Sequence, residues 1–248
     1  MTDIPPSPET IAQLAPNGVL RAAINYGNPA LATMDTMTGE LSGVSVDLSR
    51  ELASCLGVPI EVVEYANARS VVDGARENLW DVAFTGIDPE RAKEMDFSPA
   101  YLLIEGVYLV RDASPIRTIS DVDHPGRRIA VSRSSAYDLF LTREIRHAEL
   151  VRGDDPTRVA DMLIDESIDV VAGVRARSEM DAQRISGLRL LDGNFMEIRQ
   201  AMATPIGRPA GARYLAVFIE AMKASGLVER ALRTHRVDSG KVAPAAPH

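Results

Sequence analysis

The sequence predicts an α/β fold in which strands and helices alternate along the chain. Short apolar runs rich in β-branched residues are followed by longer segments that place an apolar residue every three or four positions. The alternation is broken at residues 114–115 and 124–126, which contain proline and glycine, and then begins again. A chain of 248 residues is long enough for two α/β lobes of roughly 100 residues each.

The first stretch begins with a polar, proline-rich arm at residues 1–17, which carries at most one helical turn near residues 10–14. A helix is predicted over 44–56, because its apolar residues recur at helical spacing and Gly57 and Pro59 follow directly. A second helix, over 70–78, is predicted to begin with Ser70 as its cap. Apolar strands are predicted over 20–24, 60–63, 82–85 and 108–110.

The second stretch repeats the same order of elements. Strands are predicted over 129–131, 150–152, 170–172, 188–191 and 198–204. Helices are predicted over 136–146, 157–166, 175–185, 211–225 and 228–236. The remaining residues, 237–248, are rich in alanine and proline and are predicted to form a disordered tail.

Composition narrows the functional classes. The formal net charge is −8 and there is no basic tract, so nucleic acid is not an expected partner. A single cysteine excludes a disulfide within the chain. No apolar run approaches the length of roughly 18–20 residues that spans a bilayer. The start lacks a secretory signal, which predicts a cytoplasmic location for the chain as written and a periplasmic one for a trimmed mature form.

Motifs for phosphate and metal chemistry are missing from the sequence. There is no G-x-G-x-x-G after a strand, no G-x-x-x-x-G-K-[ST] and no H-E-x-x-H, and the four histidines are scattered. We therefore expect no cofactor, no metal and no catalytic residues. The chain is expected to be a monomer.

Four segments, taken in order, resemble one protein family. They are residues 39–48 (GELSGVSVDL), 81–98 (DVAFTGIDPERAKEMDFS), 126–135 (GRRIAVSRSS) and 169–174 (DVVAGV). Over about residues 18–236 the chain resembles the family 3 extracellular solute-binding proteins, the polar-amino-acid receptors of ABC importers. The second segment matches the family's D-x-x-x-x-G…E-R…D-F-S pattern most fully, at Asp81, Gly86, Glu90, Arg91, Asp96, Phe97, Ser98 and, just beyond, Tyr101.

The resemblance implies a two-lobed type II periplasmic binding protein fold, in which each lobe is a βα sandwich and two hinge strands join the lobes. By this likeness, lobe one is discontinuous, with residues 18–111 and 197–236, and lobe two covers 112–196. The lobes are expected to close on a small ligand. The implied partners are a small carboxylate-bearing solute and the membrane subunits of an ABC importer.

The likeness assigns Arg91 as the clamp for the ligand carboxylate, because a guanidinium presents two parallel donors to a carboxylate. Thr85 and Gly86, at the end of the preceding strand, are expected to assist. The alternative left open by the sequence is a surface arginine that pairs with Glu90 or Glu94.

In lobe two the family has a Q-x-G-[ST] turn whose backbone donors hold the carboxylate at a helix N-terminus. Ser132, Arg133, Ser134 and Ser135 stand there, so the glycine is replaced. The alternative is ordinary helix capping by Ser134 or Ser135.

Three departures bear on the ligand. Val174, beside Arg175, stands where the family usually has an aspartate for the ligand ammonium, and a buried ammonium without a counter-charge is costly. Asn28 stands where the first aromatic wall is usual, with Tyr26 as a substitute, and Ala68 stands near the second. These losses predict a carboxylate ligand other than a standard α-amino acid, bound for transport or sensing.

Two alternatives remain at this point. One is a lyase similar to cyclohexadienyl dehydratase, which uses an acid a few positions after the lobe-two strand as its general acid; Arg177 stands about there and Glu179 follows. The other is a degenerate binding fold with a regulatory role.

Overall fold

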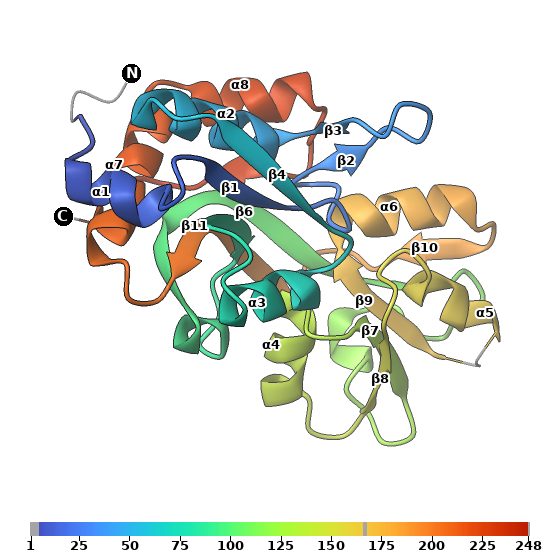
Figure 1. Cartoon of the computed structure of the whole chain (residues 1–248). Helices are drawn as coiled ribbons and strands as arrows, with labels where there is room; N and C mark the ends of the chain where they lie inside the picture. Colours follow the sequence, from blue (N-terminus) through green and yellow to red (C-terminus); the bar gives the residue numbers. More distant parts are fainter. Residues whose placement is uncertain (1–4, 166–167, 248) are drawn as a thin grey trace. The chain divides into compact units, whose positions relative to one another are not determined.

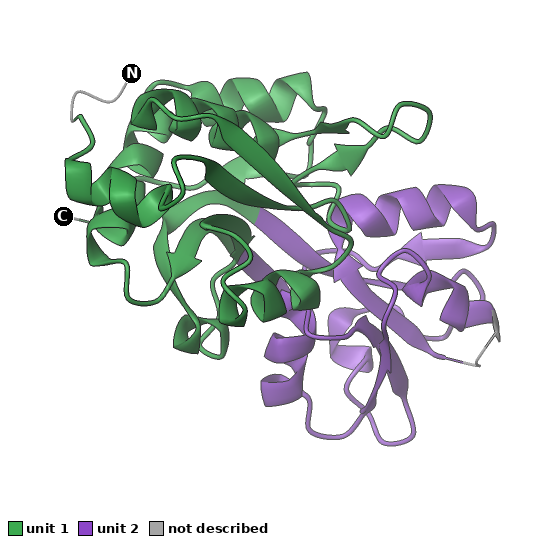
Figure 2. Cartoon of the chain, viewed as in Figure 1, with its two compact units in different colours: residues 1–103, 199–248 green, residues 104–198 purple. Residues whose placement is uncertain are grey.

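The chain divides into two compact units and passes twice between them. A computed structural model describes residues 5–165 and 168–247 (Figure 1). Unit 1 comprises Met1–Leu103 and Arg199–His248, and unit 2 comprises Ile104–Ile198 (Figure 2). The two passages lie in strands β6 (Met95–Arg111) and β11 (Met196–Pro205).

The sheet of unit 1 has the strand order β4-β1-β5-β11-β6. Strand β1 (Leu20–Asn25) pairs in parallel with β4 (Ile60–Tyr65) on one side and with β5 (Val82–Gly86) on the other. Strand β11 then runs antiparallel to β5. The carboxyl ends of the parallel strands therefore meet at one edge, where loops of α/β proteins carry ligand-binding groups.

Helices cover the sheet of unit 1. They are α1 (Pro8–Leu14), α2 (Val44–Leu56), α3 (Ala68–Arg76), α7 (Pro209–Ala224) and α8 (Leu227–Thr234) (Figure 1). Helix α3 packs on the sheet through Val71 and Ala75, which share a buried cluster with Trp80, Ala23 and Ala83. Burial of this apolar surface holds the helix to the strands.

Unit 2 is a smaller α/β layer with the strand order β6-β9-β7-β8. Strands β7 (Arg128–Ser132), β8 (Glu149–Gly153) and β9 (Val170–Val174) are parallel, and β9 pairs antiparallel with β6. The other elements are η2 (Ile119–Asp121), α4 (Ala136–Glu144), η3 (Val159–Asp161), α5 (Met162–Asp165), α6 (Arg175–Arg184) and β10 (Leu188–Leu190), which pairs with β6. The predicted α/β class is confirmed.

Several elements differ from the prediction in their ends. Helix α3 begins two residues earlier than expected, because Asn67 is its cap and accepts the Ser70 amide at 2.9 Å. Strand β6 is much longer than the predicted 108–110. The predicted helix over 157–166 forms η3 and α5, and its last residue lies outside the described residues. A short hairpin, β2 (Thr33–Met34) with β3 (Leu41–Ser42), was not predicted.

The two ends of the chain are also more ordered than the sequence predicts. The arm contains α1, and Ser7 caps this helix because its hydroxyl accepts the Thr10 amide at 3.1 Å. In the tail, β12 (Lys241–Val242) pairs with Leu102 and Leu103 of β6. The Ala243 amide also donates to the Tyr101 carbonyl at 3.0 Å, and Val237 and Ala243 are buried, so the tail packs against unit 1.

The end of α8 provides a test of local backbone strain. Arg236 has a φ of 55°. The Arg236 amide donates to the Arg233 carbonyl, and the Val237 amide donates to the Leu232 carbonyl. In this type of helix end the left-handed residue, here Arg236, is usually glycine. We expect Arg236→Gly to raise the free energy of unfolding by about 0.5–1 kcal/mol, measured by urea denaturation. Arg230→Gly, inside the same helix, should lower it instead, and a loss of stability in Arg236→Gly would contradict the assignment.

Candidate functional site

Arg91 lies at the carboxyl end of β5, on a one-turn helix, η1 (Arg91–Lys93). The preceding turn is built by Asp88, which accepts the Glu90 amide on its carboxylate at 2.8 Å and the Ala92 amide on its carbonyl at 3.0 Å. This turn directs the Arg91 side chain back over the strand. The arginine is only 2% exposed.

The structure brings together the three residues that the sequence assigned to the carboxylate in lobe one. Arg91 Nη1 donates to Thr85 Oγ1 at 2.7 Å and to the Gly86 carbonyl at 3.0 Å. Thr85 is itself buried. A hydroxyl that accepts from arginine still has its own proton to donate, so Thr85 and Arg91 together present donors suited to an anion.

Burial of Arg91 has an electrostatic consequence. Desolvation lowers the pKa of the Arg91 guanidinium to about 10, while the nearby Asp88 carboxylate raises it. A desolvated cation gains more from a bound anion than an exposed one does, because the anion replaces interactions with water. Arg91 is therefore a desolvated cation with the Asp88 carboxylate nearby.

The alternative of a surface arginine paired with Glu90 or Glu94 is wrong. Glu90 pairs with Lys93 at 2.6 Å, and Glu94 pairs with Arg76 at 3.0 Å. Both pairs involve side chains that are far more exposed than Arg91.

In unit 2, the residues from Ser132 to Ser135 form the turn between β7 and α4. Ser135 is the cap of α4, and its hydroxyl accepts the Asp138 amide at 3.0 Å. The Asp138 carboxylate in turn accepts the Ser134 amide at 2.8 Å and pairs with Arg152 at 2.9 Å. Capping by Ser135, which the sequence left open, is therefore present, and an internal carboxylate takes up one of the turn's backbone donors.

The other residues of this turn are engaged as well. Ser134 has a φ of 59°, in the left-handed region that glycine adopts most easily. Arg133 is half-buried and pairs with Asp154 at 2.6 Å. Ser132 is buried. Burial raises the pKa of the nearby Tyr137 hydroxyl, and hydrogen bonds of that hydroxyl with Ser135 and Ser132 partly offset this rise.

Val174 ends β9 and is buried, and it caps α6 without a side-chain hydrogen bond. Its neighbour Arg175 pairs with Glu105 at 2.5 Å and donates to the Gly193 carbonyl at 2.9 Å. Arg175 is thus balanced by an acid of its own unit, and no carboxylate occupies position 174.

The two candidates after β1 serve the local backbone. Asn28 is half-buried, and its carboxamide accepts the Ala30 amide at 3.1 Å, which closes a tight turn. The Tyr26 amide bonds the Tyr65 carbonyl at 3.0 Å, so Tyr26 continues the pairing of β1 with β4. Ala68 is the first residue of α3.

Three polar residues at these positions were not predicted. Asp88 builds the Arg91 turn, Glu105 neutralises Arg175, and Asp138 closes the α4 turn. Only Asp138 had a recognisable signal, because an acid three residues after Ser135 is the capping-box spacing. The contact of Glu105 with Arg175 spans 70 residues, which local patterns cannot reveal.

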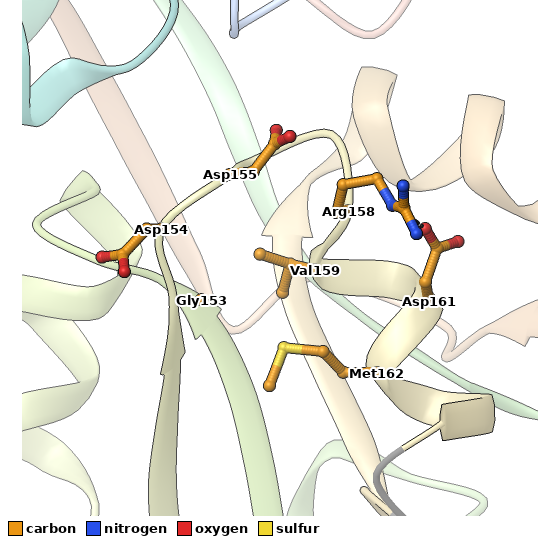
Figure 3. Close-up of a pocket in the computed structure, with 7 residues that line it drawn as sticks. All are labelled: Gly153, Asp154, Asp155, Arg158, Val159, Asp161 and Met162. Atoms are coloured by element: carbon orange, nitrogen blue, oxygen red, sulfur yellow. Dashed lines mark hydrogen bonds and ion pairs between the residues drawn. The ribbon is translucent and has the colours of Figure 1, made fainter.

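A pocket of about 280 Å³ in unit 2 contains none of the predicted site residues (Figure 3). It is lined by Gly153, Asp154, Asp155, Arg158, Val159, Asp161 and Met162. Three of its four charged groups form ion pairs: Asp154 pairs with Arg133, and Arg158 with Asp161, each at 2.6 Å. The fourth charged lining residue, Asp155, accepts the Thr157 amide at 2.8 Å and the Thr157 hydroxyl at 2.7 Å.

Within residues 5–165 and 168–247, no group of three or more His, Cys, Asp or Glu side chains is placed to hold a metal ion. In the same part of the chain, no helix has the length and apolar character needed to cross a membrane.

The α/β fold is that of a solute-binding protein. The family model for bacterial extracellular solute-binding proteins, family 3, matches residues 20–236, and the chain belongs to this family. The resemblance seen in the sequence is thereby confirmed.

Solved structures agree on the fold. A solute receptor for L-cysteine of Neisseria gonorrhoeae has a TM-score of 0.80 and 22% identity, and the match covers 92% of this chain and 94% of that one. A mutant of ArgBP from T. maritima has a TM-score of 0.77 and 21% identity, with 92% and 99% covered. These likenesses confirm the type II periplasmic binding protein fold.

The curated relatives are longer proteins. Membrane-bound lytic murein transglycosylase F of Shewanella sp. (strain ANA-3) is 25% identical over 143 residues, which are 56% of this chain. The match covers 28% of that relative, so the chain corresponds to a minor part of its length.

Proposed function

We propose that the protein binds a small carboxylate-bearing solute other than a standard α-amino acid, for transport or sensing. The observation that supports this most strongly is the buried Arg91, which Thr85 and Gly86 orient at the carboxyl end of β5. A guanidinium held in this way provides charge-assisted hydrogen bonds to a carboxylate. In this proposal Arg91 and Thr85 bind the carboxylate and Gly86 fixes the arginine.

The same proposal gives the unit 2 residues smaller roles. Ser132 and Ser135 are candidates for hydroxyl contacts with the solute, whereas Ser134, Arg133 and Arg175 bind acceptors of their own unit. The buried Val174 gives an ammonium no counter-charge. This is the reason for excluding zwitterionic amino acids as the preferred class.

Isothermal titration calorimetry against amino acids and organic acids tests the proposal. We expect Arg91→Gln to weaken binding of the best acid at least tenfold, because the charged donor is lost. Lys93→Gln, on the same helical turn but exposed, is the matched control and should keep the wild-type affinity. Thr85→Val, which removes only a hydroxyl, should also weaken binding.

Three results would contradict this function. They are binding of no acid by the wild type, unchanged affinity in Arg91→Gln, and equal losses in Arg91→Gln and Lys93→Gln. Thermal unfolding of each variant separates a loss of the site from a loss of the fold.

The lyase alternative has weaker support. One structural neighbour is an ancestral amino acid-binding protein described as a precursor of cyclohexadienyl dehydratase, at 20% identity. In this chain Glu179 is exposed and Arg177 cannot donate a proton as an acid would. We expect mass spectrometry to detect no product after incubation with prephenate or arogenate.

The choice between transport and sensing depends on the partner. One neighbour is the substrate-binding protein of an amino acid ABC transporter, and another is a histidine kinase sensor domain. Both roles use the same solute-binding step, so the calorimetric test applies to either.

A further inference from the structure

Strand β4 is the free edge of the sheet in unit 1. It stands at the end of the strand order and pairs with β1, and no other strand among the described residues pairs with it (Figure 1). A free edge presents amide donors and carbonyl acceptors to any extended chain that can pair with it, so most proteins cover or blunt such edges. The open edge of β4 therefore calls for an explanation.

The outward backbone groups of β4 belong to Ile60, Val62 and Glu64. On the inner side, the Tyr26 amide donates to the Tyr65 carbonyl at 3.0 Å, so the odd-numbered residues of β4 face β1. Successive residues of a strand direct their backbone groups to opposite sides, so the even-numbered residues face outward. None of these outward amides and carbonyls has a hydrogen-bond partner among the described residues. A chain laid along β4 would satisfy them.

Few of the usual devices keep this edge unpaired. Strand β4 pairs with β1 without a bulge over all six residues, Ile60–Tyr65, and it contains no proline and no lysine. The β-branched side chain of Val62 is 38% exposed. At the other end of the strand order, β8 has only five residues, and its Arg152 is held by Asp138 at 2.9 Å. Strand β4 is therefore the longer and less engaged of these two edges.

Two carboxylates on β4 define the chemistry of a partner. Glu61 and Glu64 are exposed, and neither forms a hydrogen bond or an ion pair with the described residues. They lie three residues apart, so the residues opposite them in a paired chain are also three apart. A second copy of β4 would bring four carboxylates together, and like charges across strands are unfavourable. Lysine or arginine at the two opposite positions would instead form favourable cross-strand pairs.

We propose that β4 is a docking site for an extended basic segment of a partner protein, which adds a strand to the sheet of unit 1. The segment carries lysine or arginine at two positions three residues apart, and an apolar β-branched residue opposite Val62. Backbone hydrogen bonds to the outward groups of β4 supply affinity, and Glu61 and Glu64 select the basic sequence. Binding at this edge uses none of the residues assigned to the solute.

Three peptides test the proposal against the full-length chain, with binding measured by fluorescence anisotropy. The first is Thr-Lys-Val-Val-Lys-Thr, blocked at both ends, which presents the same spacing in either strand direction. The second has methyl groups on both valine amides, and the third has glutamate in place of both lysines. We expect the first peptide to bind saturably and about tenfold or more tightly than the other two, because they lack the amide donors or the charges.

Two variants of the protein locate the contact. Glu64→Lys reverses one carboxylate and should weaken binding of the first peptide about fivefold or more. Glu149→Lys is the matched control, because Glu149 is an exposed glutamate on β8, and it should keep the wild-type affinity. Val62→Pro removes one outward amide and leaves the bonds to β1 in place, so binding should be lost while thermal unfolding shows a folded chain.

Hydrogen exchange gives an independent readout on the wild type. The amides of Ile60, Val62 and Glu64 should exchange more slowly when the first peptide is bound, because they then donate to its carbonyls. This measurement and the methylated peptide decide the question even if Val62→Pro does not fold.

Several results would overturn the proposal. They are no binding of the first peptide, equal binding of the methylated peptide, and equal losses in Glu64→Lys and Glu149→Lys. Sedimentation of the wild type adds one more: self-association that Glu64→Lys strengthens and Glu149→Lys leaves unchanged would show that a second copy occupies this edge instead.

Discussion

Replacing Asp81 by asparagine should lower the free energy of unfolding by about 3 kcal/mol or more, measured by urea denaturation. Asp81 is fully buried and pairs with Arg21 at 2.9 Å and with Arg208 at 2.8 Å. It also accepts the Arg21 backbone amide at 3.1 Å. Asparagine keeps the shape but not the charge, so two largely buried guanidinium groups lose the counter-ion that they share.

The effect is expected to be large because Asp81 connects elements that are distant in sequence. Arg21 lies on β1, Asp81 directly precedes β5, and Arg208 directly precedes α7. Arg208 also donates to the Gln13 carbonyl at 2.8 Å, which ties α1 to the same group. Loss of the charge at Asp81 therefore weakens several packing contacts at once.

Asp73→Asn is the matched control for Asp81→Asn. Asp73 also pairs with two arginines, Arg69 and Arg76, but these side chains are about half exposed. Exposed ion pairs contribute roughly 0–1 kcal/mol, so this variant should be close to the wild type. Similar losses in the two variants would contradict the argument from burial.

The sequence predicted the elements whose signals are local. The helix over 44–56 was predicted with the bounds that the structure has, because Gly57 ends it in the left-handed conformation at a φ of 68°. The parallel strands of both units were predicted from their apolar runs. Strand β6 was predicted too short, because Asp96, Ser98 and Pro99 interrupt its hydrophobic pattern while its backbone stays extended.

The candidate site also combines residues with local sequence signals and residues without them. Thr85, Gly86 and Arg91 lie within seven residues, so one motif could bring them together, and the structure does so. Glu105 pairs with Arg175 across 70 residues, and nothing in the local sequence of either residue indicates this contact. Only the folded chain brings the two side chains together.

Gly43→Ala should lower the free energy of unfolding by about 3 kcal/mol or more, again measured by urea denaturation. Gly43 precedes α2 with a φ of 146° and a ψ of 174°, a region that is essentially restricted to glycine. A Cβ atom there would lie 2.4 Å from the Leu31 carbonyl oxygen and 2.6 Å from the Ala32 Cα atom. Both are backbone atoms, so a side-chain rotation cannot relieve the overlap.

The segment that Gly43→Ala displaces is fixed to α2 and leads to a candidate ligand contact. Ser45 donates to the Leu31 carbonyl from its amide at 3.1 Å and from its hydroxyl at 2.9 Å, and the Leu31 amide bonds the Asn28 carbonyl at 2.9 Å. A shift at Leu31 therefore breaks its hydrogen bonds with both Ser45 and Asn28, which adds to the free-energy cost of the strained φ.

Gly39→Ala separates close approach from conformation. Gly39 also has a positive φ, 73°, but a Cβ atom there would meet nothing within 4 Å. Gly39→Ala should lower the free energy of unfolding by about 1 kcal/mol, the cost of placing alanine in the left-handed region. Equal losses in the two variants would mean that φ alone requires the glycine at position 43, whereas a larger loss in Gly43→Ala shows that contact between backbones requires it.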